Sequence, residues 1–359
     1  MSKIPHGWRM ELTDCIASYM KARFQEEVFS GPRALPDISI PFPVLCEADR
    51  ISSVISQAYR CPINVGKNRG GKTCNAEAAE RYVEVTEPSI LVTDSNTIHV
   101  WYLPDALSPK RRADVWNCLH LLREPLRESI KASPQAWQTD KSYFRDDAEL
   151  KGAINLSPAW FQQGRGPQNG FLEASQLLKS RTENISTREW VDQMSDTNAL
   201  LSAILHVIHL RMYADGREAL ICLGKQAEQW ADSDMSSILP IWSSTYSSMS
   251  VMVNRATCYH RDINGRDPWY DLLVTVGDYP PLDFVIPTLN LQLRYNPGTI
   301  ISFSGSALEH GVEAVDSDRA CLAYYMHANI HQLVHIPMCQ SPQMDNLLPR
   351  PVATGELLI

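Results

Sequence analysis

The sequence has no apolar run long enough to cross a membrane, and its nine cysteines include no Cys-x-x-Cys pair. A membrane-spanning helix needs about 20 consecutive apolar residues, and structural zinc sites usually draw on closely spaced cysteine pairs. The opening residues, MSKIPHG, lack the apolar core of a secretory signal. These absences predict an intracellular protein in a reducing compartment, with no disulfide framework, structural zinc or membrane partner.

The sequence also lacks the positive charge of a general nucleic-acid binder, because its net charge is −8. Contacts from Lys and Arg to phosphates supply most of the affinity of such proteins. The charge is uneven, however: residues 60–181 hold 17 Lys and Arg against 14 Asp and Glu, a net of +3, whereas the remainder carries a net of −11. A local basic face is therefore compatible with the sequence. The basic loop residues that such a face would use, each more often just part of a solvated loop, are Lys67, Arg69, Lys72, Lys110–Arg112 and Arg165.

No internal repeat, low-complexity tract or linker divides the chain, so we expect one catalytic domain over residues 1–359. Within it, residues 1–240 are mainly helical in pattern and are expected to support the core; residues 336–359 are an expected C-terminal tail. Helical periodicity covers residues 12–28, 109–131 and 200–212, the last with Gly216 as a plausible stop. Residues 89–93 and 97–102 are expected strands.

From residue 241 to 335 the pattern changes to short β-rich runs separated by turn signals. The expected strands are residues 248–253, 270–276, 289–295, 299–303 and 320–327. Strands at this spacing are typical of a sandwich or jelly roll. We therefore predict an α+β fold with a double-stranded β-helix core (a jelly roll, cupin-like), buttressed by the N-terminal helices.

A histidine and a carboxylate two residues apart mark a candidate metal site at His260 and Asp262. Residues i and i+2 of a strand project to the same face, so both reach one metal. His310, in SALEHGV after an expected strand, is the candidate third ligand. Two histidines and one carboxylate leave three open positions on an octahedral ion, which suits non-haem Fe(II) that takes 2-oxoglutarate through two atoms and O2 through one. We predict catalytic and metal-binding roles for these three residues, with Fe(II) and 2-oxoglutarate as cofactors.

Two arginines stand at positions compatible with this chemistry. Arg319 follows His310 by nine residues on the next expected strand, and its planar fork can bind the far carboxylate of 2-oxoglutarate through two hydrogen bonds. Arg255 precedes His260 by five residues and suits either the other end of the cosubstrate or the substrate. Taken singly, each of these residues is also readable as an ordinary surface or packing residue.

The stretch from Arg255 to His331 resembles the TET and base-J-hydroxylase (JBP) family, most of all its fungal branch. Its members are Fe(II)/2-oxoglutarate dioxygenases that oxidise methyl groups on nucleic-acid bases. The matching motifs are CYHRDING around His260, WYDLL, YNPGTIISFSG, EHGV around His310 and RACLAYYMH from Arg319. The resemblance implies iron ligation by His260, Asp262 and His310, and 2-oxoglutarate contacts from Arg319 and Arg255.

The resemblance also implies a base-binding role for Tyr325, which would stack on a flipped base, and for His327, which would hydrogen-bond to it. If Arg319 to His327 form one strand, alternate residues place both on the face of Arg319; taken alone, Tyr325 is also readable as a core aromatic. The sequence departs from the family at two positions. Cys321 replaces a hydroxyl residue two after the arginine, and Gly265 replaces a base-reading aspartate, for which Asn264 or Asp267 would substitute.

The expected substrate is 5-methylcytosine in a methylated duplex, flipped out and oxidised to 5-hydroxymethylcytosine and further, as in DNA demethylation; N6-methyladenine and thymine are alternatives. Asn155, in an expected loop at residues 152–157, is a further candidate to face the cleft. Other possibilities are a protein, lipid or metabolite substrate on the same fold, and a nucleotide hydrolase using the P-loop-like GKNRGGKT from Gly66. A DNA substrate predicts a nuclear location, DNA contacts from residues 1–240, and contacts to the DNA backbone from the basic residues Lys67, Arg69, Lys72 and Arg165. No obligate protein partner is indicated.

Overall fold

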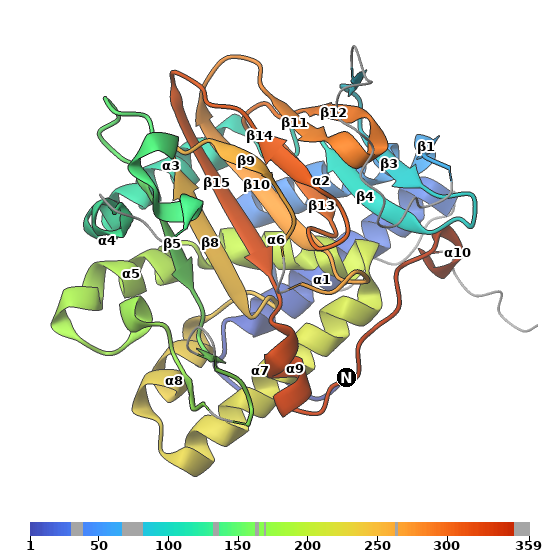
Figure 1. The fold of residues 1–359 in the computed structure, drawn as a ribbon. Coiled ribbons are helices and arrows are strands. Elements are labelled where there is room, and N and C mark those ends of the chain that lie inside the picture. The colour runs from blue at the N-terminus through green and yellow to red at the C-terminus, as the bar shows by residue number, and fades with distance from the viewer. Residues whose placement is uncertain are drawn as a thin grey trace, which may run out of the picture.

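Two facing β-sheets and a layer of helices make up the computed structural model (Figure 1), which describes residues 1–29, 39–66, 82–131, 136–161, 165–168, 170–262 and 265–347. The helices are α1 (Met10–Phe29), α2 (Phe42–Arg60), α3 (Pro109–Cys118), α4 (Arg123–Ser129), α5 (Ile185–Gln193), α6 (Ser195–Ile208), α7 (Leu210–Trp230), α8 (Ser233–Ile238), α9 (Ala328–Leu333) and α10 (Met344–Leu347). None of these described helices is long and apolar enough to span a membrane.

The strands come from both halves of the chain. They are β1 (Pro62–Asn64), β2 (Val83–Val85), β3 (Ser89–Val92), β4 (Ile98–Leu103), β5 (Gly152–Leu156), β6 (Trp160–Phe161), β7 (Leu172–Glu173), β8 (Ser248–Val253), β9 (Thr257–His260), β10 (Asp271–Asp278), β11 (Asp283–Ile286), β12 (Leu291–Arg294), β13 (Ile300–Phe303), β14 (His310–Val312) and β15 (Asp318–Tyr325). The large sheet has the order β1-β3-β4-β13-β10-β15-β8-β5, and the smaller one β2-β12-β11-β14-β9. The hairpin β6–β7 stands apart from both.

Alternation along the strands divides the apolar residues into two cores. On β15, Leu322 and Tyr324 pack toward the helices, whereas Cys321 packs between the two sheets with Phe284 and Phe303. This is the two-faced burial expected of a sheet with side chains on both sides. The fold is thus the predicted double-stranded β-helix with helices covering its large sheet; α2 lies on β3 and β4, and α3 on β10 (Figure 1).

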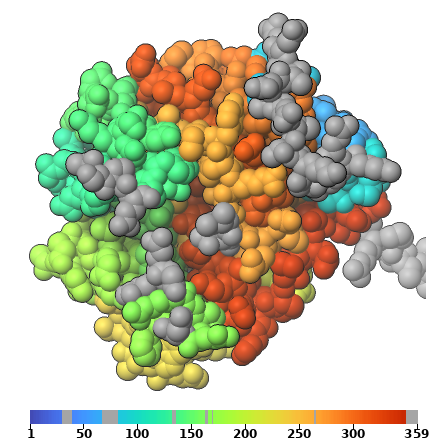
Figure 2. Space-filling view, viewed as in Figure 1, coloured from blue at the N-terminus to red at the C-terminus, as the bar shows by residue number. Residues whose placement is uncertain are grey.

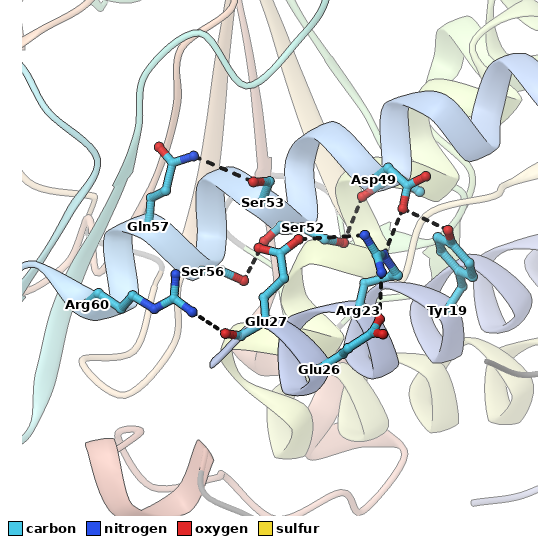
Figure 3. Close-up of polar contacts among 11 residues, drawn as sticks. Tyr19, Arg23, Glu26, Glu27, Asp49, Ser52, Ser53, Ser56, Gln57 and Arg60 are labelled. Carbon is cyan, nitrogen blue, oxygen red and sulfur yellow. Dashed lines mark hydrogen bonds and ion pairs between the residues drawn. The ribbon is translucent and has the colours of Figure 1, made fainter. Parts of the chain in front are cut away.

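The helical layer is held together by apolar packing and by polar contacts between α1 and α2 (Figure 3). Arg23 of α1 donates to the carboxylate of Asp49 on α2 at 3.0 Å, and the hydroxyl of Tyr19 donates to the same group at 2.7 Å. At the other end of the pair, Arg60 donates to the backbone carbonyl of Glu27. These contacts fix α1 against α2, and α2 in turn packs on β3 and β4 of the large sheet.

Two helix predictions were wrong in detail, for local reasons. The segment 109–131 is not one helix: α3 ends at Cys118, a 3-10 turn follows, and α4 restarts with Pro125 in its first turn, where proline has no N–H to continue the earlier helix. Gly216 is not a stop, because it lies inside α7. A Cβ there would collide with the Met326 side chain and the Thr245 carbonyl, so this glycine allows close packing.

The strand before the P-loop-like segment is β1, which pairs with β3 alone among the described strands and lies at the edge of the large sheet. Its residues Pro62 and Asn64 are exposed. A phosphate-binding loop follows a buried central strand, so this environment disagrees with the hydrolase interpretation. The loop itself, from residue 67 onward, lies outside the described residues.

Candidate active site

His260 and His310 face each other across two neighbouring antiparallel strands of the smaller sheet. They are direct register partners on β9 and β14, and their ring centroids are 4.3 Å apart. His260 Nδ1 lies 3.0 Å from the backbone carbonyl oxygen of Cys258, and His310 Nδ1 lies 3.0 Å from that of Leu308. Such a bond places the proton on Nδ1 and leaves the Nε2 lone pair for a metal.

Asp262 completes the cluster just beyond the end of β9. Its Oδ1 lies 3.5 Å from His260 Nε2, and its Oδ2 lies 3.9 Å from His310 Nε2. One ligand atom from each of the three residues falls within 4.8 Å of the others. The backbone N–H of Asp262 donates to the carbonyl of Gly305 at 2.9 Å, which ties this loop to the segment before β14.

The electrostatics suit a cation. Burial lowers the pKa of His310 to about 4, so this imidazole is neutral and its lone pair available at neutral pH. Burial also works against a charged Asp262, but the two histidines outweigh it and lower the pKa of the carboxyl, which keeps it ionised. Behind the cluster, burial and the charge of Asp262 raise the pKa of Asp271 well above its usual value, so this second carboxyl favours its neutral form.

Two buried arginines lie beside the cluster and lack anionic partners. Arg319 is 5% exposed and Arg255 is 8% exposed. Both guanidinium groups donate to backbone carbonyls. Arg319 donates to the carbonyl of Arg255 at 3.2 Å, and Arg255 donates to the carbonyl of Gln138 at 3.2 Å. In the described part of the chain neither forms an ion pair with a carboxylate, and both Nε atoms are buried without a partner. Buried, unpaired cations destabilise a fold unless an anion binds, so the pair fits a dianionic cosubstrate.

Trp137 joins the arginine pair to the histidines, although no sequence feature indicated it. The guanidinium carbon of Arg255 lies 4.9 Å from the centroid of this indole, and the imidazole of His260 lies 5.0 Å from it on another side. Trp137 begins the 3-10 turn η3 (Trp137–Thr139), whose next residue, Gln138, accepts the bond from Arg255. This turn of the first half therefore holds Arg255 at the site.

One face of β15 extends away from this site, and we call this face the β15 wall. Cys321 and Ala323 belong to the core between the sheets, and Arg319 and Tyr325 alternate with them along the strand. His327 lies beyond the strand end, with its ring 5.3 Å from that of Tyr325. Arg319 and Tyr325 therefore share one face of the strand as expected, whereas the expected strand to His327 is too long, because β15 ends at Tyr325 and His327 caps α9.

The far end of the wall carries a polar group without a partner. The Nε2 atom of His327 is buried and unbonded among the described residues, and burial lowers the pKa of this histidine to about 4. Next to it, the hydroxyl of Ser250 donates to Asn155 Oδ1 at 2.6 Å and lies 3.4 Å from the hydroxyl of Tyr325. A buried polar atom without a protein partner can be satisfied by water or by a bound molecule.

Asn155 was expected in a loop, and this is wrong, because residues 152–156 form β5 at the edge of the large sheet. Asn155 is the register partner of Ser250 on β8, which is why both reach the Tyr325 end of the wall. The apolar Ile154 and Leu156 on either side are buried and account for the strand. Figure 2 looks onto this face, where green segments of the first half border orange and red segments of the second.

The remaining substrate- and DNA-binding candidates are two exposed residues and a group that lies outside the described residues. Asp267 is exposed and accepts a hydrogen bond from Ser306 at 2.9 Å, beside the loop of Gly305. Arg165 is exposed in the connection between β6 and β7, a hairpin that touches the wall where Trp160 packs 6.4 Å from His327. Asn264, Lys67, Arg69 and Lys72 lie outside the described residues, so their roles stay predictions.

A double-stranded β-helix with a His–Asp–His cluster beside unpaired arginines is the arrangement of the Fe(II)/2-oxoglutarate dioxygenase class. Comparison with known proteins identifies the branch: residues 160–328 match the family model Tet_JBP, the "Oxygenase domain of the 2OGFeDO superfamily". Residues 160–328, just under half of the chain, are thus similar to the TET/JBP oxygenase domain, and Fe(II) and 2-oxoglutarate are the cofactors that the site fits. His260, Asp262 and His310 would hold the iron, and Arg319 and Arg255 the cosubstrate.

The fold is also similar to a solved structure, "NgTET1 in complex with 5mC DNA". The similarity covers 86% of this chain and 98% of that one, with a TM-score of 0.51 and 13% sequence identity. At this identity the comparison concerns the fold. A search of curated proteins finds no significant match.

Proposed function

We propose that this protein oxidises the methyl group of 5-methylcytosine in DNA to 5-hydroxymethylcytosine, and by repeated turnover further, after flipping the base out of the duplex. The observation that carries the proposal is the wall of β15. It runs from Arg319 to Tyr325 and ends at the buried, unpartnered Nε2 of His327. The fold similarity to NgTET1, which was solved with 5mC DNA, supports the same substrate class.

The chain's own residues would bind and orient the base. Bound iron, 2-oxoglutarate and O2 supply the oxidation of a C–H bond, while the cosubstrate is converted to succinate and CO2. Tyr325 offers an aromatic face for stacking, worth roughly 1–3 kcal/mol per base, which offsets part of the few kcal/mol that flipping costs. His327 offers one hydrogen bond to an edge of the base, and Ser250 and Asn155 fix the Tyr325 hydroxyl end. A DNA substrate also makes a nuclear location our proposal.

The experiment is a substrate comparison with purified protein, Fe(II), 2-oxoglutarate and O2. Matched oligonucleotide duplexes carry 5-methylcytosine, N6-methyladenine or only unmodified bases including thymine, and products are identified by mass spectrometry. The proposal expects oxidised cytosine as the main product, absent with Asp262→Ala protein. Preferred oxidation of adenine or thymine would replace the proposed base. If no base is oxidised while 2-oxoglutarate still binds to the metal-loaded protein, the nucleic-acid substrate is wrong.

A further inference from the structure

The position two residues after Arg319 carries a thiol, that of Cys321, between the two sheets. Cys321 is 5% exposed and faces the core between the sheets. A thiol is a weak hydrogen-bond donor, and burial raises the pKa of this one, which keeps it protonated. It is therefore a poor substitute for a hydroxyl that would bind a carboxylate beside Arg319.

Tyr295 brings a hydroxyl to this position from the opposite sheet. It follows β12 directly and is fully buried, with its ring 5.5 Å from that of Phe284. Its hydroxyl oxygen lies 3.4 Å from Cys321 Sγ, and the guanidinium carbon of Arg319 lies 5.6 Å from its ring centroid. The phenol of Tyr295 therefore reaches Cys321 across the space between the two sheets.

The hydroxyl of Tyr295 has no strong partner, in contrast to the neighbouring Tyr279. The hydroxyl of Tyr279 donates to the backbone carbonyl of Tyr295 at 2.9 Å and lies 2.6 Å from Thr275 Oγ1, so it is fully engaged. In the described structure, the Tyr295 hydroxyl meets only the thiol of Cys321. Burying a hydroxyl without a good acceptor costs free energy.

The Nε atom of Arg319 is the second underused donor here, since it is buried without a partner. Two donors from opposite sheets, one of them cationic, suit an acceptor with several lone pairs, as a carboxylate has. We infer that the hydroxyl of Tyr295 donates a hydrogen bond to the distal carboxylate of 2-oxoglutarate, together with Arg319. It does so in place of the hydroxyl that is missing at Cys321. This contact selects 2-oxo acids that have a second carboxylate. The inference concerns the cosubstrate and is independent of the DNA substrate.

The test measures ligand binding to protein loaded with Mn(II), so that no turnover occurs. Calorimetry compares 2-oxoglutarate with oxalate, which chelates the metal but has no distal carboxylate. Tyr295→Phe keeps the ring and removes only the hydroxyl. It should weaken 2-oxoglutarate binding about tenfold or more, the size expected for a lost hydrogen bond to a charged group, and leave oxalate binding unchanged. Tyr279→Phe is the matched control and should show no such difference between the ligands.

A second variant makes the test independent of how well Tyr295→Phe folds. Cys321→Ser restores the missing hydroxyl, so it should recover 2-oxoglutarate affinity in the Tyr295→Phe background and not weaken it in the wild-type background. Equal loss of 2-oxoglutarate and oxalate affinity in Tyr295→Phe would show general damage to the site and overturn the assignment. Unchanged 2-oxoglutarate affinity, or absence of rescue by Cys321→Ser, would overturn it as well.

Discussion

The carboxylate of Asp262 lies directly against the α-carbon of Gly305. A Cβ built on Gly305 would come within 3.0 Å of both Asp262 Oδ2 and Asp271 Oδ2, far inside van der Waals contact. The N–H of Gly305 also donates to Asp271 Oδ2 at 3.1 Å. The iron-binding carboxylate and the buried carboxyl behind it are thus separated by a residue without a side chain.

Gly305→Ala should therefore displace Asp262 and weaken iron binding about 10- to 100-fold, the range seen when the support of a metal ligand is disturbed. Iron titration of the purified variant measures this directly. Gly166→Ala is a matched control, because a Cβ there meets nothing within 4 Å. Wild-type iron affinity in Gly305→Ala would show that Asp262 is not held as described.

Asp262→Ala should abolish stoichiometric iron binding and turnover while leaving the fold intact, since the side chain is 48% exposed and its loss opens no core cavity. Metal analysis and circular dichroism give the two readouts. Asp267→Ala removes a nearby exposed carboxylate that bonds to Ser306 and should retain iron. Retained iron-dependent turnover in Asp262→Ala would refute the ligand assignment.

Trp137→Leu should weaken 2-oxoglutarate binding without removing iron. The substitution deletes the cation–π contact with Arg255, worth roughly 0.5–2 kcal/mol, or about 2- to 30-fold in affinity. Binding of 2-oxoglutarate to Mn(II)-loaded protein measures it. Trp160→Leu alters an indole near His327 instead and should leave cosubstrate affinity unchanged. Equal effects of both variants would argue against a specific role for Trp137.

Tyr325→Ala should lower kcat/KM for the methylated oligonucleotide by about 5- to 150-fold, as expected when a stacking face is lost. Tyr325→Phe keeps that face, loses only the contact with Ser250 and should stay within a few-fold of wild type. Steady-state kinetics on both variants, with 2-oxoglutarate binding as a check on the inner site, distinguishes the two. Similar losses in both would assign the role to the hydroxyl instead.

Stability should fall as the pH is lowered from 7 to 5.5. Burial lowers the pKa of His209 and of His331 to about 4 in the folded protein, against about 6.5 in the unfolded chain. As the pH falls, these histidines are protonated first in the unfolded state. Their contribution to the free energy of unfolding is therefore complete above about pH 6.5 and is lost as the pH falls toward 4. The two histidines together should contribute about 2 kcal/mol to the difference between pH 7 and 5.5.

Urea denaturation of metal-free protein at both pH values measures this difference. His331→Asn removes one titrating group, so it should reduce the pH dependence by about half of the contribution of the pair, whatever it does to stability at pH 7. An unchanged pH dependence in this variant would contradict the burial argument for His331, which is 3% exposed.

The parts of the site that could be predicted are those with a local pattern. The position of Arg319 and the alternation toward Tyr325 depend on strand geometry within one segment, and both residues lie on β15. The strand argument for Asp262 was wrong in detail, because β9 ends at His260 and the carboxylate reaches the cluster from the residues that follow the strand. Trp137 could not be found this way, because its role arises from packing against Arg255, more than a hundred residues later.

Other failures came from residues whose local meaning is ambiguous. Gly216 has the same appearance in sequence whether it ends a helix or lets Met326 approach one. Asn155 lies in a short strand at the sheet edge, and five residues with flanking turn signals do not distinguish an edge strand from a loop. The phenol of Tyr295 reaches Cys321 from the other sheet, a contact between sheets that periodicity does not encode.

The order of the large sheet has a consequence for any attempt to isolate the metal-binding half. The strands β13, β10, β15 and β8 stand in the middle, flanked by β4, β3 and β1 on one side and by β5 on the other. A fragment of residues 241–335 would therefore expose new edges along β13 and β8 of the large sheet, and along β12 of the smaller sheet, which loses β2. Each such edge is a template for pairing with another chain. Such a fragment should polymerise through these edges, and a soluble minimal enzyme has to begin upstream of β1.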